Sequence, residues 1–142
     1  MTIPQLSIFI ENRSGTLIKV LEVLKQANIQ IVASTIADTA EYGIYRLICS
    51  EPMRACEELK RADIAVALSD VFALEIDDQP GRAADAVKMF SQADISITYM
   101  YSFLLRGKGI LVFRTDDNER AAKVIDENKL RTVSEAALTS LA

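Results

Sequence analysis

The sequence contains no histidine and no tryptophan, and it has only two cysteines among 142 residues. Without histidine, the chain lacks the commonest general base and the commonest metal ligand. Cys49 falls in a predicted strand and Cys56 in a predicted helix, and two separated cysteines cannot assemble a zinc site. We therefore expect two buried thiols rather than a disulfide, and we expect no metal and no cofactor.

Long apolar runs and clusters of positive charge are also missing. No segment approaches the roughly 18 apolar residues of a membrane span, and the first residues lack the pattern of a signal peptide. The formal net charge is −4, with 16 basic and 20 acidic residues, and the basic residues are scattered. This balance argues against binding to nucleic acid or to an anionic membrane. We expect a compact cytoplasmic protein.

What the sequence does contain is an internal repeat. Gly15 and Gly43 recur as Gly81 and Gly109, each 66 positions later. The same offset pairs Ile10 with Ile76, Gln26 with Gln92, Ala27 with Ala93, Ile29 with Ile95, Ile31 with Ile97, Ile44 with Ile110 and Arg54 with Arg120. This period exceeds the roughly 20–50 residues of a solenoid repeat. We therefore expect two small domains, at residues 1–69 and 70–142.

Each copy shows the order strand, helix, strand, strand, helix, strand. Alternating apolar residues predict the first strand at 6–10. The apolar spacing after Gly15 predicts a helix that ends near Asn28, with Ser14 as its N-cap. The other elements expected in the first copy are strands 29–37 and 43–50, a helix from Pro52 and a short strand 64–68. The second copy is expected to have strands 71–76, 95–103 and 109–115, helices after Pro80 and around 121–125, and a weak closing strand 130–133.

A βαββαβ unit is typical of the ferredoxin-like α+β fold, in which an antiparallel sheet carries both helices on one face. The second strands, 29–37 and 95–103, would be exposed hydrophobic edges, so we expect the sheets of the two domains to pair side by side. The other face is also apolar, at Phe9, Ile44, Ile110 and Val112. Such a face predicts a covering layer, here a second subunit in a homodimer, unless these are scattered surface residues.

The loops ENRSGTL (11–17) and DDQPGRA (77–83) each deliver the chain into a helix. Free amides at a helix N-terminus favour a carboxylate, and Gly15 and Gly81 permit close approach. Polar side chains before each glycine offer oxygens to an ammonium group. The two features together predict an amino-acid site, whereas the alternative is that these residues only cap helices.

The pattern of strand, [DN]-x-[PS]-G-x-[LA], helix and β-branched strand resembles the ACT domain. Both copies match, and the resemblance covers essentially the whole chain, which is similar to small stand-alone proteins made of two ACT domains. It implies a non-catalytic regulatory protein that senses a free amino acid, and an enzyme of amino-acid metabolism as a possible partner. In that family, ligands sit between the strand-to-helix loop of one domain and the second strand of its neighbour.

The resemblance assigns ligand binding to two loops and two strands. The candidate residues are Asn12, Arg13, Ser14, Gly15 and Thr16 in the first loop, Asp78, Pro80 and Gly81 in the second, Ser34 and Thr35 on one strand, and Tyr99, Met100, Tyr101 and Ser102 on the other. Ser14 and Ala83 depart from the family's proline and leucine, so the two sites need not both bind. The tyrosines also have a structural interpretation as fillers of the sheet face.

Two alternatives remain open. An acylphosphatase-like enzyme would use a phosphate-cradling loop with an arginine, which Arg13 superficially fits, although Gln79 replaces it in the second copy. A ligand-free interaction module is the other possibility. The acidic residues Asp116, Asp117 and Glu119 indicate a solvated turn and helix start rather than a metal site.

Overall fold

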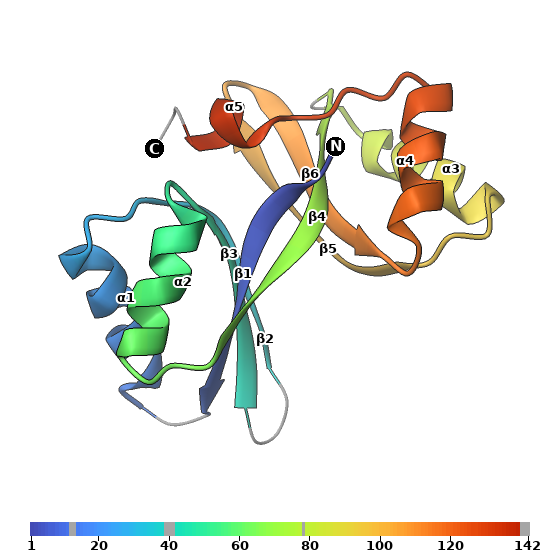
Figure 1. Cartoon of the computed structure of the whole chain (residues 1–142). Coiled ribbons are helices and arrows are strands. Elements are labelled where there is room, and N and C mark those ends of the chain that lie inside the picture. Colours follow the sequence, from blue (N-terminus) through green and yellow to red (C-terminus); the bar gives the residue numbers. More distant parts are fainter. Residues whose placement is uncertain (12–13, 39–41, 78, 140–142) are drawn as a thin grey trace. The chain divides into compact units, whose positions relative to one another are not determined.

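The computed structural model describes residues 1–11, 14–38, 42–77 and 79–139. Its elements follow in the order β1 (Ile3–Glu11), α1 (Thr16–Gln26), β2 (Ile31–Asp38), β3 (Tyr42–Cys49), α2 (Pro52–Arg61), β4 (Val66–Ile76), α3 (Arg82–Gln92), β5 (Ile97–Leu105), β6 (Lys108–Thr115), α4 (Asn118–Glu127) and α5 (Glu135–Thr139). Two βαββαβ units account for this order, and the predicted α+β class is confirmed (Figure 1).

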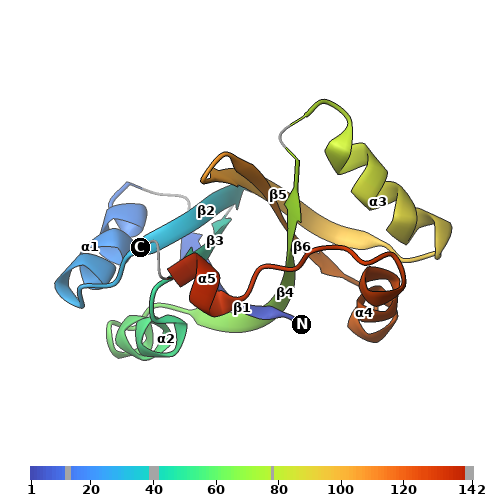
Figure 2. The same ribbon diagram turned by 90° about the horizontal axis from the view of Figure 1, so that it is seen from above.

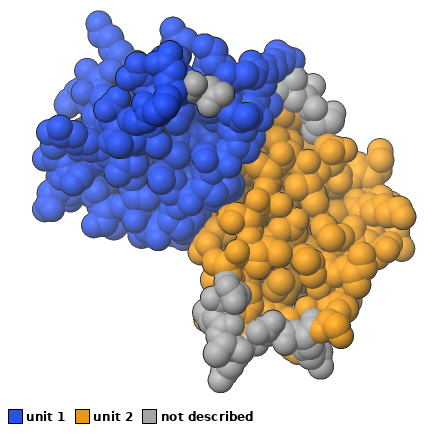
Figure 3. Space-filling view, turned by 180° about the vertical axis from the view of Figure 1, so that it is seen from behind, with its two compact units in different colours: residues 1–3, 70–134 blue, residues 4–69, 135–142 orange. Residues whose placement is uncertain are grey.

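The chain divides into two compact units, which Figure 3 shows in different colours. One, orange and labelled unit 2 in Figure 3, contains Pro4–Ser69 together with Glu135–Ala142, and we call it the first unit because it holds the first copy of the repeat. The other, blue and labelled unit 1 in Figure 3, contains Met1–Ile3 together with Asp70–Ser134, and we call it the second unit. Each unit also includes a short terminal segment from the opposite end of the chain.

In the first unit, β3 lies between β1 and β2, and both pairings are antiparallel. The amide of Phe9 donates to the carbonyl of Ala65 at 3.0 Å, which joins β1 to the chain that leads into β4. Helices α1 and α2 lie side by side on one face of these strands (Figures 1 and 2). Their apolar stripes close over the helix-facing side chains of the strands, with Leu6, Ile8, Leu24, Leu47 and Leu59 almost completely buried.

In the second unit, β6 pairs with β4 and β5, and helices α3 and α4 contact each other. The predicted weak closing strand consists of a single bridge, Leu74 to Thr132, with the amide of Val133 donating to the carbonyl of Ala73 at 2.9 Å. Phe113 occupies the centre of the core. Its ring centroid lies 5.6 Å from that of Phe72 and 5.1 Å from that of Phe90, in tilted and edge-on geometries that aromatic rings prefer.

The strands form one six-stranded antiparallel sheet in the order β2-β3-β1-β4-β6-β5. The predicted continuous sheet is therefore confirmed. The reason we gave for it, that pairing would cover the second strand of each domain, is wrong, because these strands, β2 and β5, lie at the two ends of the sheet. The two strands predicted at 64–68 and 71–76 are a single strand, β4. No glycine or proline interrupts residues 66–76, so nothing in the local sequence breaks the extended chain.

The expectation for the second sheet face is wrong in part. Ile110 is 2% exposed and Val112 is 0% exposed in the single chain, so neither needs a second subunit to exclude water. Phe9 is 47% exposed and agrees with the expectation.

Helix α5, whose Leu138 is fully buried, was not predicted, because five residues are too few to show a helical period.

Glycines start the first helix of each unit. Gly15 and Gly81 occupy the N-cap positions of α1 and α3 with φ of 90° and 86°, a left-handed conformation that glycine adopts without steric cost. The prediction of Ser14 as the N-cap is therefore wrong by one residue. By contrast, Asp117 caps α4 as expected for a helix start, because its Oδ1 accepts the amide of Arg120 at 3.1 Å.

Both cysteines are free and buried, as predicted. Among the described residues, no helix combines the length and the apolar character needed to cross a membrane.

Candidate functional site

The first unit has a cavity of about 760 Å³ where β1 ends and α1 begins. The described residues that line it come from the end of β1, the loop, the first turn and a half of α1, the start of β3 and the segment before β4. They are Phe9, Ile10, Glu11, Ser14, Gly15, Thr16, Lys19, Val20, Tyr42, Asp63, Ile64 and Ala65. The cavity therefore belongs wholly to the first copy of the repeat.

The loop that borders this cavity is closed by its own backbone. The hydroxyl of Thr16 donates to the carbonyl of Glu11 at 2.7 Å, which ties the start of α1 to the end of β1. A β-carbon on Gly15 would meet no atom within 4 Å, so the backbone conformation, and not crowding, accounts for this glycine. Because Gly15 has no side chain, it offers no oxygen to accept hydrogen bonds from the first backbone amides of α1. These amides form the positive end of the helix dipole.

Two side chains of opposite charge, Lys19 and Asp63, line the first cavity. Lys19 lies one turn into α1 and Asp63 lies between α2 and β4, and both side chains are exposed. Within the part of the chain that the structure describes, neither side chain forms an ion pair or a hydrogen bond. The rest of the lining includes the apolar side chains of Phe9, Val20 and Ile64. Among its described lining residues, this cavity therefore offers a cation and an anion without partners, together with an apolar wall.

The second unit has a smaller cavity, of about 320 Å³, at the equivalent place. Its described lining residues are Glu75, Ile76, Asp77, Arg82, Asp85, Ala86, Met89, Leu130 and Arg131. Two substitutions change its chemistry: Arg82 stands where the first unit has Thr16, and Asp85 stands where it has Lys19. The sign of the charge one turn into the helix is thereby reversed.

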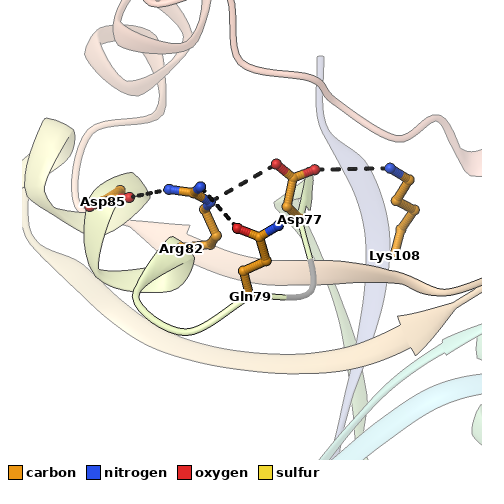
Figure 4. Close-up of polar contacts among 5 residues, drawn as sticks. All are labelled: Asp77, Gln79, Arg82, Asp85 and Lys108. Carbon is orange, nitrogen blue, oxygen red and sulfur yellow. Dashed lines mark hydrogen bonds and ion pairs between the residues drawn. The ribbon is translucent and has the colours of Figure 1, made fainter.

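Arg82 is the centre of a polar cluster in the second cavity (Figure 4). Its Nη1 lies 3.2 Å from Asp85 Oδ2, and its Nη2 donates to Gln79 Oε1 at 3.1 Å. Its Nε lies 3.9 Å from Asp77 Oδ2, and the other oxygen of Asp77 lies 3.9 Å from Lys108 Nζ. The donors of the guanidinium group thus face oxygen acceptors that belong to the chain itself.

The structure brings together three of the predicted loop residues, since Ser14, Gly15 and Thr16 all line the first cavity. Asn12, Arg13 and Asp78 lie outside the described residues. Pro80 and Gly81 are exposed and do not line the second cavity. The role of these residues in binding stays a prediction.

The predicted strand residues lie apart from the cavities. Ser34 and Thr35 are on β2, which is separated from β1 by β3. The hydroxyl oxygen of Ser34 accepts a hydrogen bond from the hydroxyl of Tyr45 at 3.2 Å.

The four candidate residues of β5 do not share a face. Tyr99 and Tyr101 are half-buried, whereas Met100 and Ser102 are exposed, because successive side chains of a strand point to opposite faces. They therefore face opposite sides of the sheet, and their role in binding stays a prediction.

Reasoning from sequence missed Lys19 and Asp63. Lys19 follows Gly15 by one helical turn, so helical periodicity could have placed it beside the loop. No pattern in the sequence indicates Asp63, because the residues after α2 come close to the end of β1 only in the folded structure.

Several known proteins are similar to this chain. The family described as ACT domain pair matches residues 1–142. The crystal structure of protein BT0572 from Bacteroides thetaiotaomicron is 36% identical, with a TM-score of 0.92 over 98% of this chain and 96% of that one. No curated protein sequence matches.

Two regulatory subunits of aspartate kinase share the fold at 13% identity. The one from Thermus thermophilus, in its ligand-free form, has a TM-score of 0.61 over 87% of this chain and 91% of its own. The one from Thermus flavus has a TM-score of 0.60 over 87% of this chain and 88% of its own. Together with the repeated loop, strand and helix pattern of both units, the match over the whole sequence shows that this chain belongs to the family of ACT domain pairs.

Proposed function

We propose that this protein is a non-catalytic regulator that binds one free amino acid in the cavity of the first unit. The observation that carries the proposal is the pair of opposite charges, Lys19 and Asp63, which have no partner among the described residues and line a cavity at the N-terminus of α1. A zwitterion needs a cation and an anion in the same small site. Charge-assisted hydrogen bonds at both ends would fix its orientation.

The expected pose follows from the charges. The carboxylate of the ligand would bind the first amides of α1 and the ammonium of Lys19, because both carry positive charge. The ammonium of the ligand would bind Asp63, with Asn12 as a further acceptor. Phe9, Val20 and Ile64 would then face the ligand side chain, which favours an amino acid with an apolar side chain.

The partners of the protein are part of the same proposal. β2 and β5 end the sheet with unpaired edges, and we propose a homodimer in which an edge of one chain pairs with an edge of another. Such pairing would complete the sites with residues from β2 and β5, as the resemblance implies for Ser34, Thr35 and Tyr99 to Ser102. Two of the similar structures are regulatory subunits of aspartate kinase, and we propose an enzyme of amino-acid metabolism as the regulated partner, in the cytoplasm.

A thermal-shift screen with the twenty common amino acids tests this function. A ligand that binds only the folded state stabilises it by RT ln(1 + [L]/Kd), which is about 2.7 kcal/mol at a hundred times Kd. Titration calorimetry then gives the affinity of any amino acid that raises the melting temperature. If none of the twenty raises it, the amino-acid proposal is wrong.

One observation favours a second candidate, an interaction module without a ligand. The charged groups of the second cavity are paired within the chain, as expected where no ligand binds. A module whose two sites had both decayed would give no shift in the screen and would still bind its protein partner.

A further inference from the structure

The second unit keeps the loop, the glycine and the helix of the first, but a charged side chain of the protein, Arg82, lines its cavity and pairs with two acidic residues there. We propose that Arg82 acts as an internal substitute for the ligand and closes the second cavity, so that each chain binds one amino acid and binds it in the first unit. This inference rests on the proposed function and adds to it where the ligand binds and how many molecules bind.

The acidic groups of the second cavity are all paired. Asp77 and Asp85 both pair with Arg82, and Glu75 Oε1 lies 3.9 Å from Arg131 Nη1. The position equivalent to Asp63 is Lys129, which follows from the offset of the repeat. In the first unit, Asp63 would bind the ammonium group of the ligand. The second unit has a basic residue at this position, which would repel that group.

The carboxylate end is also disfavoured. Asp85 lies in the first turn of α3, where it accepts from the guanidinium of Arg82 at 3.2 Å. A ligand carboxylate at this helix N-terminus would be repelled by Asp85, whereas the equivalent Lys19 of the first unit would attract it.

An amino acid would have to displace Arg82 to bind in the second cavity. Each ion pair of Arg82 is solvent-exposed and weak on its own. However, the side chain is tethered beside its partners, so its effective concentration is far above that of a free ligand. The smaller volume, about 320 Å³ against about 760 Å³, agrees with a cavity that the chain partly fills.

The inference predicts that the second cavity can be opened by giving it the residues of the first. In the double variant Arg82→Thr and Asp85→Lys, the cluster is removed and the charge one turn into the helix becomes positive. We would titrate ¹⁵N-labelled wild type and variant with each of the twenty amino acids, using the amide signals of Gly15 and Gly81 as reporters of the two cavities. Lys123→Thr, which removes an exposed basic residue of the second unit outside the cavity, is the matched control.

For wild type and for the control, we expect one amino acid to shift the signal of Gly15 but not that of Gly81, with one ligand bound per chain. For the double variant, we expect at least a tenfold gain in affinity at the second cavity and a shift of Gly81. Two ligands bound to wild type, or no gain in the variant, would overturn the role of Arg82 and leave the proposed function intact. Binding to the variant alone, through Gly81, would support the role of Arg82 and refute the site in the first unit, and binding to neither protein would refute both.

Discussion

Gly109 lies directly opposite Ile76 in the antiparallel ladder of β6 and β4, and a β-carbon on Gly109 would lie 3.0 Å from Ile76 Cγ1. The first unit repeats this contact between Gly43 and Ile10, where the corresponding distance is 3.3 Å. Each glycine thus leaves room for a large side chain at the end of the unit's first strand. The 66-residue repeat is therefore a repeat of packing as well as of sequence.

We expect Gly109→Ala to lower the free energy of unfolding by about 1–3 kcal/mol, because the new methyl group overlaps Ile76 in a closely packed strand pair. Gly43→Ala should cost less, since its neighbour is 0.3 Å further away. Urea denaturation measures both. In a double-mutant cycle, Ile76→Ala should remove the penalty of Gly109→Ala, and simple additivity of the two changes would contradict the contact.

Helix capping provides a second test with a built-in control. Asp117→Ala removes the oxygen that accepts the amide of Arg120, and we expect it to cost about 1 kcal/mol of stability. The equivalent residue of the first unit is Glu51, whose side chain makes no cap hydrogen bond with α2. Glu51→Ala should therefore lower the urea midpoint less than Asp117→Ala does. Equal losses in the two variants would show that the cap does not stabilise α4.

The order of strands and helices could be predicted from the sequence because each element carries its own period of apolar residues. The continuity of β4 could not, since the polar pair Ser69 and Asp70 interrupts the apolar pattern without breaking the extended backbone. The burial of Ile110 and Val112 could not be predicted either, because it depends on tertiary packing. Local alternation of apolar residues does not report such packing.

The candidate site could be predicted only where it is local in sequence. Gly15 and Thr16 belong to one loop, so the motif found them. Asp63 approaches the loop only through the fold, and the closure of the second cavity depends on where Arg82 points. A motif that allows any residue after the glycine contains no information on that point.

Burial of Cys49 gives the protein a predictable alkaline response. Removal from water, together with the negative charges of Glu135 and Glu51, raises the pKa of this thiol from 9.0 to about 11. Below pH 9 the thiol is neutral in both the folded and the unfolded state. As the pH rises from 9 towards 11, the unfolded chain loses the proton first, so the stability contributed by the buried neutral thiol is lost.

Comparison with Cys49→Ala isolates this effect from the titration of lysines and tyrosines. We expect the free energy of unfolding of the wild type to fall more steeply than that of the variant between pH 9 and 11, by at most about 1.4 kcal/mol per pH unit. Urea denaturation at several pH values measures both slopes. Parallel slopes would mean that the thiol ionises equally well in the folded protein.

The edge strand β5 is expected to mediate self-association. Its nine residues include no charged side chain, although natural edge strands usually carry charges that prevent pairing. Leu104, 65% exposed, lies on this edge strand. We expect a dimer in sedimentation equilibrium at micromolar concentration and a shift towards monomer in Leu104→Lys. Met53→Lys, at an equally exposed position on α2, should leave the dimer intact, and a wild-type monomer would contradict the prediction.

Lys19 and Asp63 should contribute separately to amino-acid affinity, because they are expected to bind opposite ends of the ligand. Lys19→Met and Asp63→Asn each remove one charge and nearly conserve volume, and asparagine tolerates the positive φ of 62° found at Asp63. Loss of one charge-assisted hydrogen bond at an exposed site costs about 1.5 kcal/mol, which is about tenfold in Kd. The double variant should lose about a hundredfold, since independent contributions add. Titration calorimetry measures these losses, with Lys25→Met on the same helix but outside this cavity as the control. If both variants bind as tightly as the wild type, the ligand does not use the charges of the first cavity.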